Sequence, residues 1–122
     1  MNATQGDLLE KNLYQVMNER DPSKRRAAME NIYTADATFF EVDEVATGYD
    51  AVDAIIQSIL EKIPPDFVFH RITPAMENHN VGRLSWGVGP VGGSDVVTGT
   101  DVALFKDGRI QSLYVFLDKS GT

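Results

Sequence analysis

The chain changes its hydrophobic period once, at Pro64-Pro65, and this change limits the folds that it can adopt. Before the prolines, apolar residues recur at the three- and four-residue spacing of amphipathic helices. After them, β-branched and aromatic residues come in four blocks near 67–77, 81–88, 94–105 and 110–118. Asp107-Gly108 joins the last two blocks and supplies the positive φ angles of a tight hairpin. Helices followed by a meander of strands predict an α+β fold.

Three helices are expected in the first half of the chain. The first spans roughly 5–19, where Thr4 and Asp7 have the spacing of a capping box. The second begins after Asp21-Pro22, an N-cap followed by a first-turn proline, and runs through Tyr33. A short extended segment over 38–43 precedes the third helix. That helix has the clearest apolar stripe, Val52, Ile55, Ile56, Ile59, Leu60 and Ile63.

Composition favours one globular domain, residues 1–122, with 43% hydrophobic and 24% charged residues. The net charge of −7 opposes nucleic acid as a partner. No apolar stretch is long enough to cross a membrane, and the first residues do not resemble a secretory leader, so we expect a cytoplasmic protein. Without cysteine, and with His70 and His79 nine positions apart, no metal site is expected. We interpret Lys24-Arg25-Arg26 as a solvated helix face.

Both faces of the predicted sheet are apolar. One alternation holds Leu84, Trp86, Val88, Val102, Leu104, Tyr114 and Phe116, and the other holds Asp101, Ala103, Phe105, Leu113, Val115 and Leu117. Three short helices can cover only one face, so we expect the other to pack against a second copy of the chain. The sequence therefore predicts a homodimer, with Trp86 on the dimer face.

Asp101 is a carboxylate inside a strand that is otherwise buried on both faces. Removing an ionised carboxylate from water costs several kcal/mol unless it is paired, hydrogen-bonded or neutralised. Backbone amides or Arg83 on a neighbouring strand could satisfy it as a structural ion pair. The alternative is a carboxyl that faces an apolar pocket, where burial raises the pKa of a general acid or base.

From about Leu8 to Asp118, the chain resembles the SnoaL-like members of the NTF2-like superfamily. The residues that carry the resemblance are the segments 33–38, Gly48-Tyr49-Asp50-Ala51-Val52, Thr98-Gly99-Thr100-Asp101 and Asp107-Gly108-Arg109-Ile110. The resemblance implies a strongly curved mixed or antiparallel sheet that forms a cone around an apolar pocket, covered by the helices. It also implies pairing through the outer face of the sheet in many members.

The resemblance to ketosteroid isomerase within this superfamily implies candidate site residues. It places Glu41 where that enzyme has its carboxylate base and Asp101 where it has a neutral, hydrogen-bond-donating acid. The remaining residues expected to bind the substrate are Tyr14, Arg83, His70, Leu13, Met17, Val115 and Leu117. The comparison with limonene epoxide hydrolase aligns an arginine with Arg83 but leaves Ser85 and Val115 where carboxylates are needed, which opposes epoxide hydrolysis.

Two functions are compatible with these residues. The first is an isomerase, cyclase or dehydratase that moves protons on a small apolar metabolite bearing a carbonyl group, with Asp101 and Glu41 as proton carriers. The second is a non-catalytic dimeric domain that binds a ligand or acts as an accessory subunit. No cofactor is expected, because the glycine pattern over 87–92 leads into a strand rather than the helix of a dinucleotide site.

Overall fold

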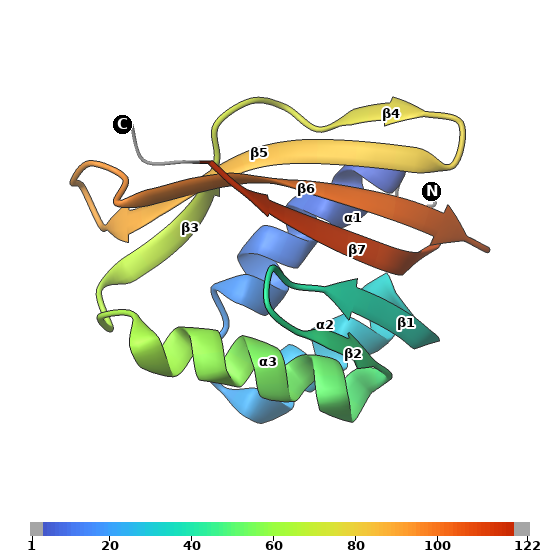
Figure 1. Ribbon diagram of the computed structural model, residues 1–122, viewed down its shortest axis with the longest axis horizontal. Helices are drawn as coiled ribbons and strands as arrows, with labels where there is room; N and C mark the ends of the chain where they lie inside the picture. Colours follow the sequence, from blue (N-terminus) through green and yellow to red (C-terminus); the bar gives the residue numbers. More distant parts are fainter. Residues whose placement is uncertain (1–3, 119–122) are drawn as a thin grey trace.

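The computed structural model describes residues 4–118, in three helices and a seven-stranded sheet (Figure 1). Residues 1–3 and 119–122 of the expected domain lie outside the described residues. The helical segments are α1 (Gln5–Lys11) with the π-helical continuation η1 (Asn12–Met17), α2 (Pro22–Ile32) and α3 (Tyr49–Lys62). The strands are β1 (Tyr33–Phe40), β2 (Val45–Thr47), β3 (Phe67–Arg71), β4 (Met76–Asn78), β5 (Val81–Pro90), β6 (Val97–Lys106) and β7 (Arg109–Leu117). The α+β class and the three helices are confirmed.

The first helix begins with the predicted capping box. The Thr4 hydroxyl accepts from the backbone N–H of Asp7 at 3.0 Å, and the Asp7 carboxylate accepts from the backbone N–H of Thr4 at 3.1 Å. From Asn12 the helix continues as a π-helix to Met17, two residues before the predicted end. A π-helical turn is rare and often lies at a functional site, and this one forms part of the site described below.

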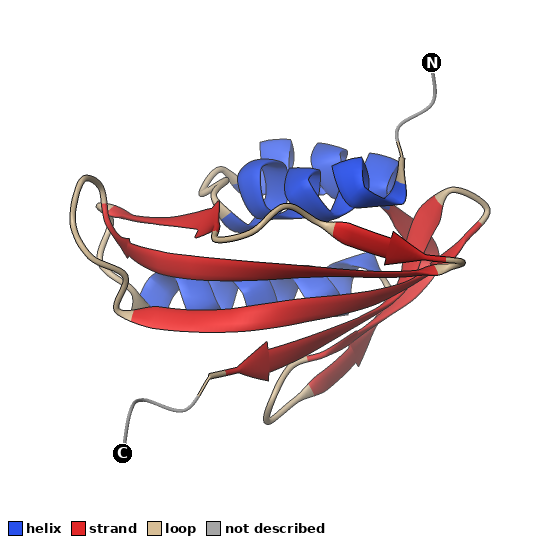
Figure 2. Cartoon of the chain, turned by 90° about the horizontal axis from the view of Figure 1, so that it is seen from above, coloured by secondary structure: helices blue, strands red, loops and turns tan. Residues whose placement is uncertain are grey.

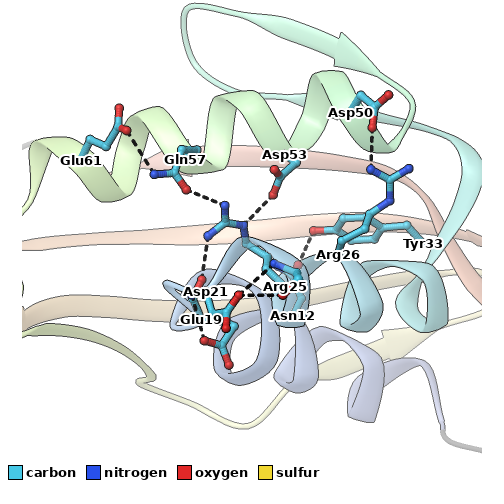
Figure 3. A network of polar contacts seen from close by, with 11 residues as sticks. Asn12, Glu19, Asp21, Arg25, Arg26, Tyr33, Asp50, Asp53, Gln57 and Glu61 are labelled. Carbon is cyan, nitrogen blue, oxygen red and sulfur yellow. Dashed lines mark hydrogen bonds and ion pairs between the residues drawn. The ribbon is translucent and has the colours of Figure 1, made fainter.

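The interpretation of Lys24-Arg25-Arg26 as a solvated face is wrong for Arg25, whose side chain is completely buried and makes the polar contacts drawn in Figure 3. Its Nε donates to Asp53 on α3 at 2.6 Å, and its other nitrogens donate to Gln57 on α3 and to the backbone carbonyl of Glu19. A buried guanidinium needs such partners because its desolvation is costly. Arg25 therefore links α2 to α3.

Helix α3 begins and ends where the sequence predicts. Gly48 precedes it at φ +90°, a backbone angle that favours glycine, and the helix ends at Lys62, before Pro64. Its apolar stripe is buried against the sheet, with Ile56 completely enclosed. Packing of this stripe on β1 and β2 fixes one wall of the molecule.

The sheet has the strand order β2-β1-β7-β6-β5-β3, with β4 paired to β5 outside this path. All pairs are antiparallel except β1 with β7, which is parallel and places Phe39 beside Leu113. The sequence predicted an extended segment over 38–43, but strand β1 is longer and begins five residues earlier, at Tyr33. Helix α2 ends at Ile32, so the chain is already extended at Tyr33.

The long strands curve around the helices, which lie on one side of them (Figure 2). The sheet stays open, and no helix between residues 4 and 118 covers the opposite face of β5, β6 and β7 (Figures 1 and 2), although the loop over 91–96 packs on Gly87 and Gly89 at one end of it. The homodimer expected on this face stays a prediction, which sedimentation at micromolar concentration can test. Between residues 4 and 118, no helix combines the length and the apolar character that crossing a membrane requires.

Candidate functional site

A cavity of about 180 Å³ lies between the inner face of the sheet and the helical layer. Apolar side chains form most of its wall, and partly exposed Val97 and Leu117 contribute to it. The lining residues are Asn12, Leu13, Met17, Phe39, Glu41, Ile59, Ile63, Phe69, Trp86, Val88, Val97, Asp101, Leu113, Val115 and Leu117. An apolar cavity with a few polar groups in its wall is the usual form of a small-molecule site.

Asp101 is one of those polar groups and is only 4% exposed. Its Oδ1 accepts a hydrogen bond from Nε1 of Trp86 at 2.9 Å, whereas Oδ2 receives none from any residue between 4 and 118. Burial raises the pKa of Asp101 from 3.8 to about 7, against the opposing effect of the Trp86 hydrogen bond. Asp101 is therefore a carboxyl that can hold or release a proton near neutral pH.

The position of Trp86 corrects the expectation that it lies on the dimer face. Leu84 pairs with Asp101 and Trp86 pairs with Gly99, so the even-numbered residues of β5 share a face with the odd-numbered residues of β6. Trp86 consequently lines the cavity, and its ring meets Phe69 edge-on at a centroid distance of 5.5 Å. The same register pairs Arg83 with Val102, which puts it on the face opposite Asp101 and excludes their ion pair.

Asn12 is a polar residue of the cavity wall that sequence reasoning missed. The Tyr33 hydroxyl donates to its Oδ1, and its Nδ2 has no acceptor among residues 4–118, although the side chain is completely buried. Burial and the nearby charge of Asp101 raise the pKa of Tyr33, which keeps its hydroxyl protonated. Asn12 gave no sequence signal because a polar residue beside an apolar stripe normally faces solvent.

Glu41 lies just after β1 and lines the same cavity as Asp101. It is partly exposed, and its carboxylate accepts from the backbone N–H of Asp43 at 3.1 Å, in the connection between β1 and β2. The structure thus brings the two predicted proton carriers to one cavity. Four predicted apolar residues line it as well: Leu13, Met17, Val115 and Leu117.

Tyr14, Arg83 and His70 do not line this cavity. Tyr14 is 45% exposed, and its hydroxyl accepts from the backbone N–H of Arg71 at 3.0 Å. Arg83 is exposed and contacts the sulfur of Met76 at 3.1 Å. Tyr14 therefore lies on the exposed side of η1, and Arg83 points to the face of β5 opposite its neighbour Leu84.

His70 also lies outside the cavity, because its neighbour Phe69 points inward. Its Nε2 lies 2.6 Å from Oδ1 of Asp95, and this hydrogen bond is the main cause of a raised pKa of His70. Elsewhere in the part of the chain from 4 to 118, no three histidine or acidic side chains gather as they would around a metal ion. Among residues 4–118, no lysine or arginine lines the cavity to hold a phosphate-bearing cofactor.

The likeness to known proteins extends over nearly the whole chain. The family model described as "SnoaL-like domain" matches residues 11–113. A solved structure of a proposed isomerase of the SnoaL-like family from Agrobacterium tumefaciens is 26% identical, with a TM-score of 0.81 over 96% of this chain and 100% of that chain. A search of curated proteins gave no match.

Two further solved structures share the fold at lower identity. A proposed ketosteroid isomerase from Kribbella flavida is 14% identical, with a TM-score of 0.72 over 97% of this chain and 80% of that chain. A proposed SnoaL-like polyketide cyclase from Jannaschia sp. CCS1 is 12% identical, with a TM-score of 0.75 over 97% of this chain and 91% of that chain. Together with the match over residues 11–113, the fold and the cavity place this chain in the SnoaL-like domain family.

Proposed function

We propose that this protein catalyses proton transfer on a small apolar metabolite that carries a carbonyl group, in an isomerisation, cyclisation or dehydration. The observation that carries the proposal is Asp101, a buried carboxyl in the wall of an apolar cavity whose pKa lies at about 7. A proton carrier works best when its pKa is close to the working pH, because both protonation states are then populated.

The hydrogen bond from Trp86 assigns a role to each oxygen of Asp101. Oδ1 is held by the indole, so the proton of the neutral acid belongs on Oδ2, which accepts nothing from the described chain. From there it can be donated to a carbonyl oxygen, where it stabilises the negative charge that develops when a neighbouring C–H bond ionises. Such donors are most effective in sites of low polarity, as this cavity is.

Glu41 is the proposed base. It would remove the proton from the carbon next to the carbonyl, and the electron pair of that C–H bond would move toward the oxygen held by Asp101. Return of the proton to a different carbon completes an isomerisation without any change of oxidation state. Support for this assignment is that Glu41 and Asp101 are the two acidic residues of the cavity wall. The likeness to a proposed isomerase at 26% identity is compatible with it.

A direct test uses the conversion of the β,γ-unsaturated form of cyclohexenone into its conjugated isomer, followed by ultraviolet absorbance. Asp101→Leu should lower kcat/KM by roughly 10²–10³, the usual effect of losing one donor to a developing oxyanion. Glu41→Gln should lower it by roughly 10²–10⁴ through loss of the base. Asp95→Asn is the matched control, because Asp95 is an acid outside the cavity wall.

The pH dependence gives a second criterion. The wild-type rate should fall as the pH rises through the Asp101 pKa of about 7, because the donated proton is lost. Equal rates for wild type, Asp101→Leu and Glu41→Gln would refute the proposal. Failure of every ketone that binds to exchange its α-protons with deuterated water would refute it as well.

A further inference from the structure

The size of the cavity limits its ligand. An apolar cavity of about 150 Å³ in another protein encloses one benzene molecule, so the roughly 180 Å³ measured here corresponds to one ring with a small substituent. A second fused ring, or the further rings of a steroid, would have to extend past the exposed Val97 and Leu117, out of the cavity, or displace the wall. This limit is meaningful only where the wall is rigid.

The wall is rigid around Trp86. Its ring lies so close to Gly99 that a Cβ on Gly99 would approach the indole Cζ2 to 2.6 Å. The ring therefore cannot move back toward β6, whose backbone it already touches. Its edge-on contact with Phe69 holds it from the side of β3, and its hydrogen bond to Asp101 fixes its rotation. Enlarging the cavity on this side would require the sheet to deform.

The charges of the wall exclude anions. Among residues 4–118, Glu41 and Asp101 are its titratable groups, and no lysine, arginine or histidine of that part of the chain lines it. A carboxylate or phosphate ligand would lose its hydration without gaining a cation, which is costly in an apolar site. The portion of the ligand that enters therefore carries no negative charge.

Two polar groups of the wall offer hydrogen-bond donors, Asp101 and Asn12. Below its pKa, Asp101 presents a proton on Oδ2, and Asn12 has an Nδ2 without an acceptor among residues 4–118. The Oδ1 atom of Asn12 is already occupied by Tyr33, which fixes the orientation of the amide. A buried donor that finds no acceptor costs free energy, so an acceptor oxygen on the ligand would be favoured.

We propose that the cavity selects single-ring molecules that carry no negative charge and have one acceptor oxygen, which takes a hydrogen bond from Asp101 and lies beside the amide of Asn12. The proposal rests on the proposed function only in that the cavity is the ligand site, and it holds for a binding protein as well as for an enzyme. It separates this chain's ligand from a steroid by size and from a carboxylic acid by charge.

Binding of five probes by isothermal titration calorimetry tests the proposal. Acetophenone should bind about tenfold more tightly than α-methylstyrene, which has the same shape but a CH₂ group in place of the oxygen. Benzoate tests the exclusion of anions, and acetonaphthone and androstenedione test the size limit; all three should fail to bind. Trp86 is the chain's sole tryptophan, so its fluorescence reports independently whether a probe enters this cavity.

Variants connect the selectivity to named groups. Asp101→Leu should abolish the preference for acetophenone over α-methylstyrene, whereas Asp95→Asn should keep it. Asn12→Leu should reduce the preference. Tyr33→Phe keeps the Asn12 amide but removes the hydroxyl that fixes its orientation, so it should reduce the preference less. In the wild type, the preference should also disappear above the Asp101 pKa of about 7, where the donated proton is lost.

A gain-of-binding variant tests the size limit without relying on loss of function. Leu113 lines the cavity, whereas Leu104 lies on the outer face of the same sheet, so Leu113→Ala enlarges the cavity and Leu104→Ala is its control. Acetonaphthone should bind to Leu113→Ala only. Binding of androstenedione or benzoate to the wild type as tightly as acetophenone would overturn the proposal, as would equal binding of acetophenone and α-methylstyrene.

These outcomes are distinct from those that test catalysis. Selective binding of acetophenone without isomerisation of cyclohexenone would refute the proposed function and leave the ligand class intact. Isomerisation of cyclohexenone together with tight binding of androstenedione would support the proposed function and refute the proposed ligand class.

Discussion

Nε1 of Trp86 donates to Oδ1 of Asp101 across the β5–β6 strand pair, at 2.9 Å. This contact joins the largest aromatic ring of the cavity to its most buried acid, and it leaves one carboxyl oxygen free to act on a ligand. It also moderates the effect of burial, because a hydrogen bond to the ionised form lowers a pKa.

Trp86→Phe should therefore raise the pKa of Asp101 above its value of about 7. The phenyl ring keeps most of the packing but cannot donate, so only burial acts on the carboxyl. A ¹³C NMR titration of the aspartate carboxyls measures the shift. The lowered pKa values of Asp7 and Asp21, which come from hydrogen bonds with Thr4 and Ser23, are internal references and should not move. An unchanged Asp101 pKa would contradict the role given to Trp86.

Asp101 should also make stability depend on pH. Its pKa is raised from 3.8 in the unfolded chain to about 7 in the folded one, so the folded state binds more protons between these values. The free energy of unfolding is then highest below the unfolded-state pKa, decreases as the pH rises toward the folded-state pKa, and levels off above it. At about 1.4 kcal/mol per pKa unit, the decrease amounts to a few kcal/mol.

Urea denaturation of wild type and Asp101→Asn at a series of pH values measures this contribution. Asparagine cannot ionise, so the variant should become the more stable of the two above the Asp101 pKa. The raised pKa of His70 also makes stability fall with rising pH, but it acts equally in both proteins and cancels in the difference. A pH-independent difference would show that Asp101 does not titrate as proposed.

Arg25→Met should destabilise the protein by on the order of 3 kcal/mol, because it leaves the partners of a buried guanidinium without their donor. Arg25→Lys should recover little of this loss, since one ammonium group cannot reach Asp53, Gln57 and the Glu19 carbonyl together. The control is Arg26→Met on the same helix, where the ion pairs are exposed and the expected loss of stability is much smaller. Thermal unfolding of the three variants gives the ranking.

Gly87→Ala should lower the pKa of His70. Gly87 is the cross-strand partner of His70, and a Cβ there would lie 2.2 Å from Oδ2 of Asp95, so the added methyl group displaces the carboxylate that raises the histidine pKa. Asp95→Asn should produce the same shift without any steric change. Proton NMR titration of the imidazole signals distinguishes the variants, and a His70 pKa that stays raised in Gly87→Ala would contradict this geometry.

Local patterns predicted much of the fold. The stripe of α3 and its ending before Pro64 depend on neighbouring residues alone, as does the β6–β7 hairpin, where Asp107 and Gly108 have the positive φ angles expected of that turn. The alternation of β6 grouped Asp101 with Ala103 and Phe105, the resemblance to ketosteroid isomerase implied that it faces the pocket, and the structure places it in the cavity wall.

The face on which Trp86 lies could not be predicted from alternation alone. Each strand shows which of its residues share a face, but the register between two strands decides which faces coincide. The β5–β6 register depends on the loop over 91–96, whose path the sequence does not determine. The burial of Arg25 and Asn12 was missed for a related reason, because both depend on how separate helices pack.

The parallel pairing of β1 with β7 has a consequence for the order in which the protein is made. Phe39 leaves the ribosome long before Leu113, so during synthesis one edge of β1 has no hydrogen-bonding neighbour until β7 emerges. The nascent chain therefore carries an unpaired strand edge, although α3 can already pack on β1 and β2. Val115 and Leu117 belong to β7, so the wall of the cavity is completed only when that strand has been made.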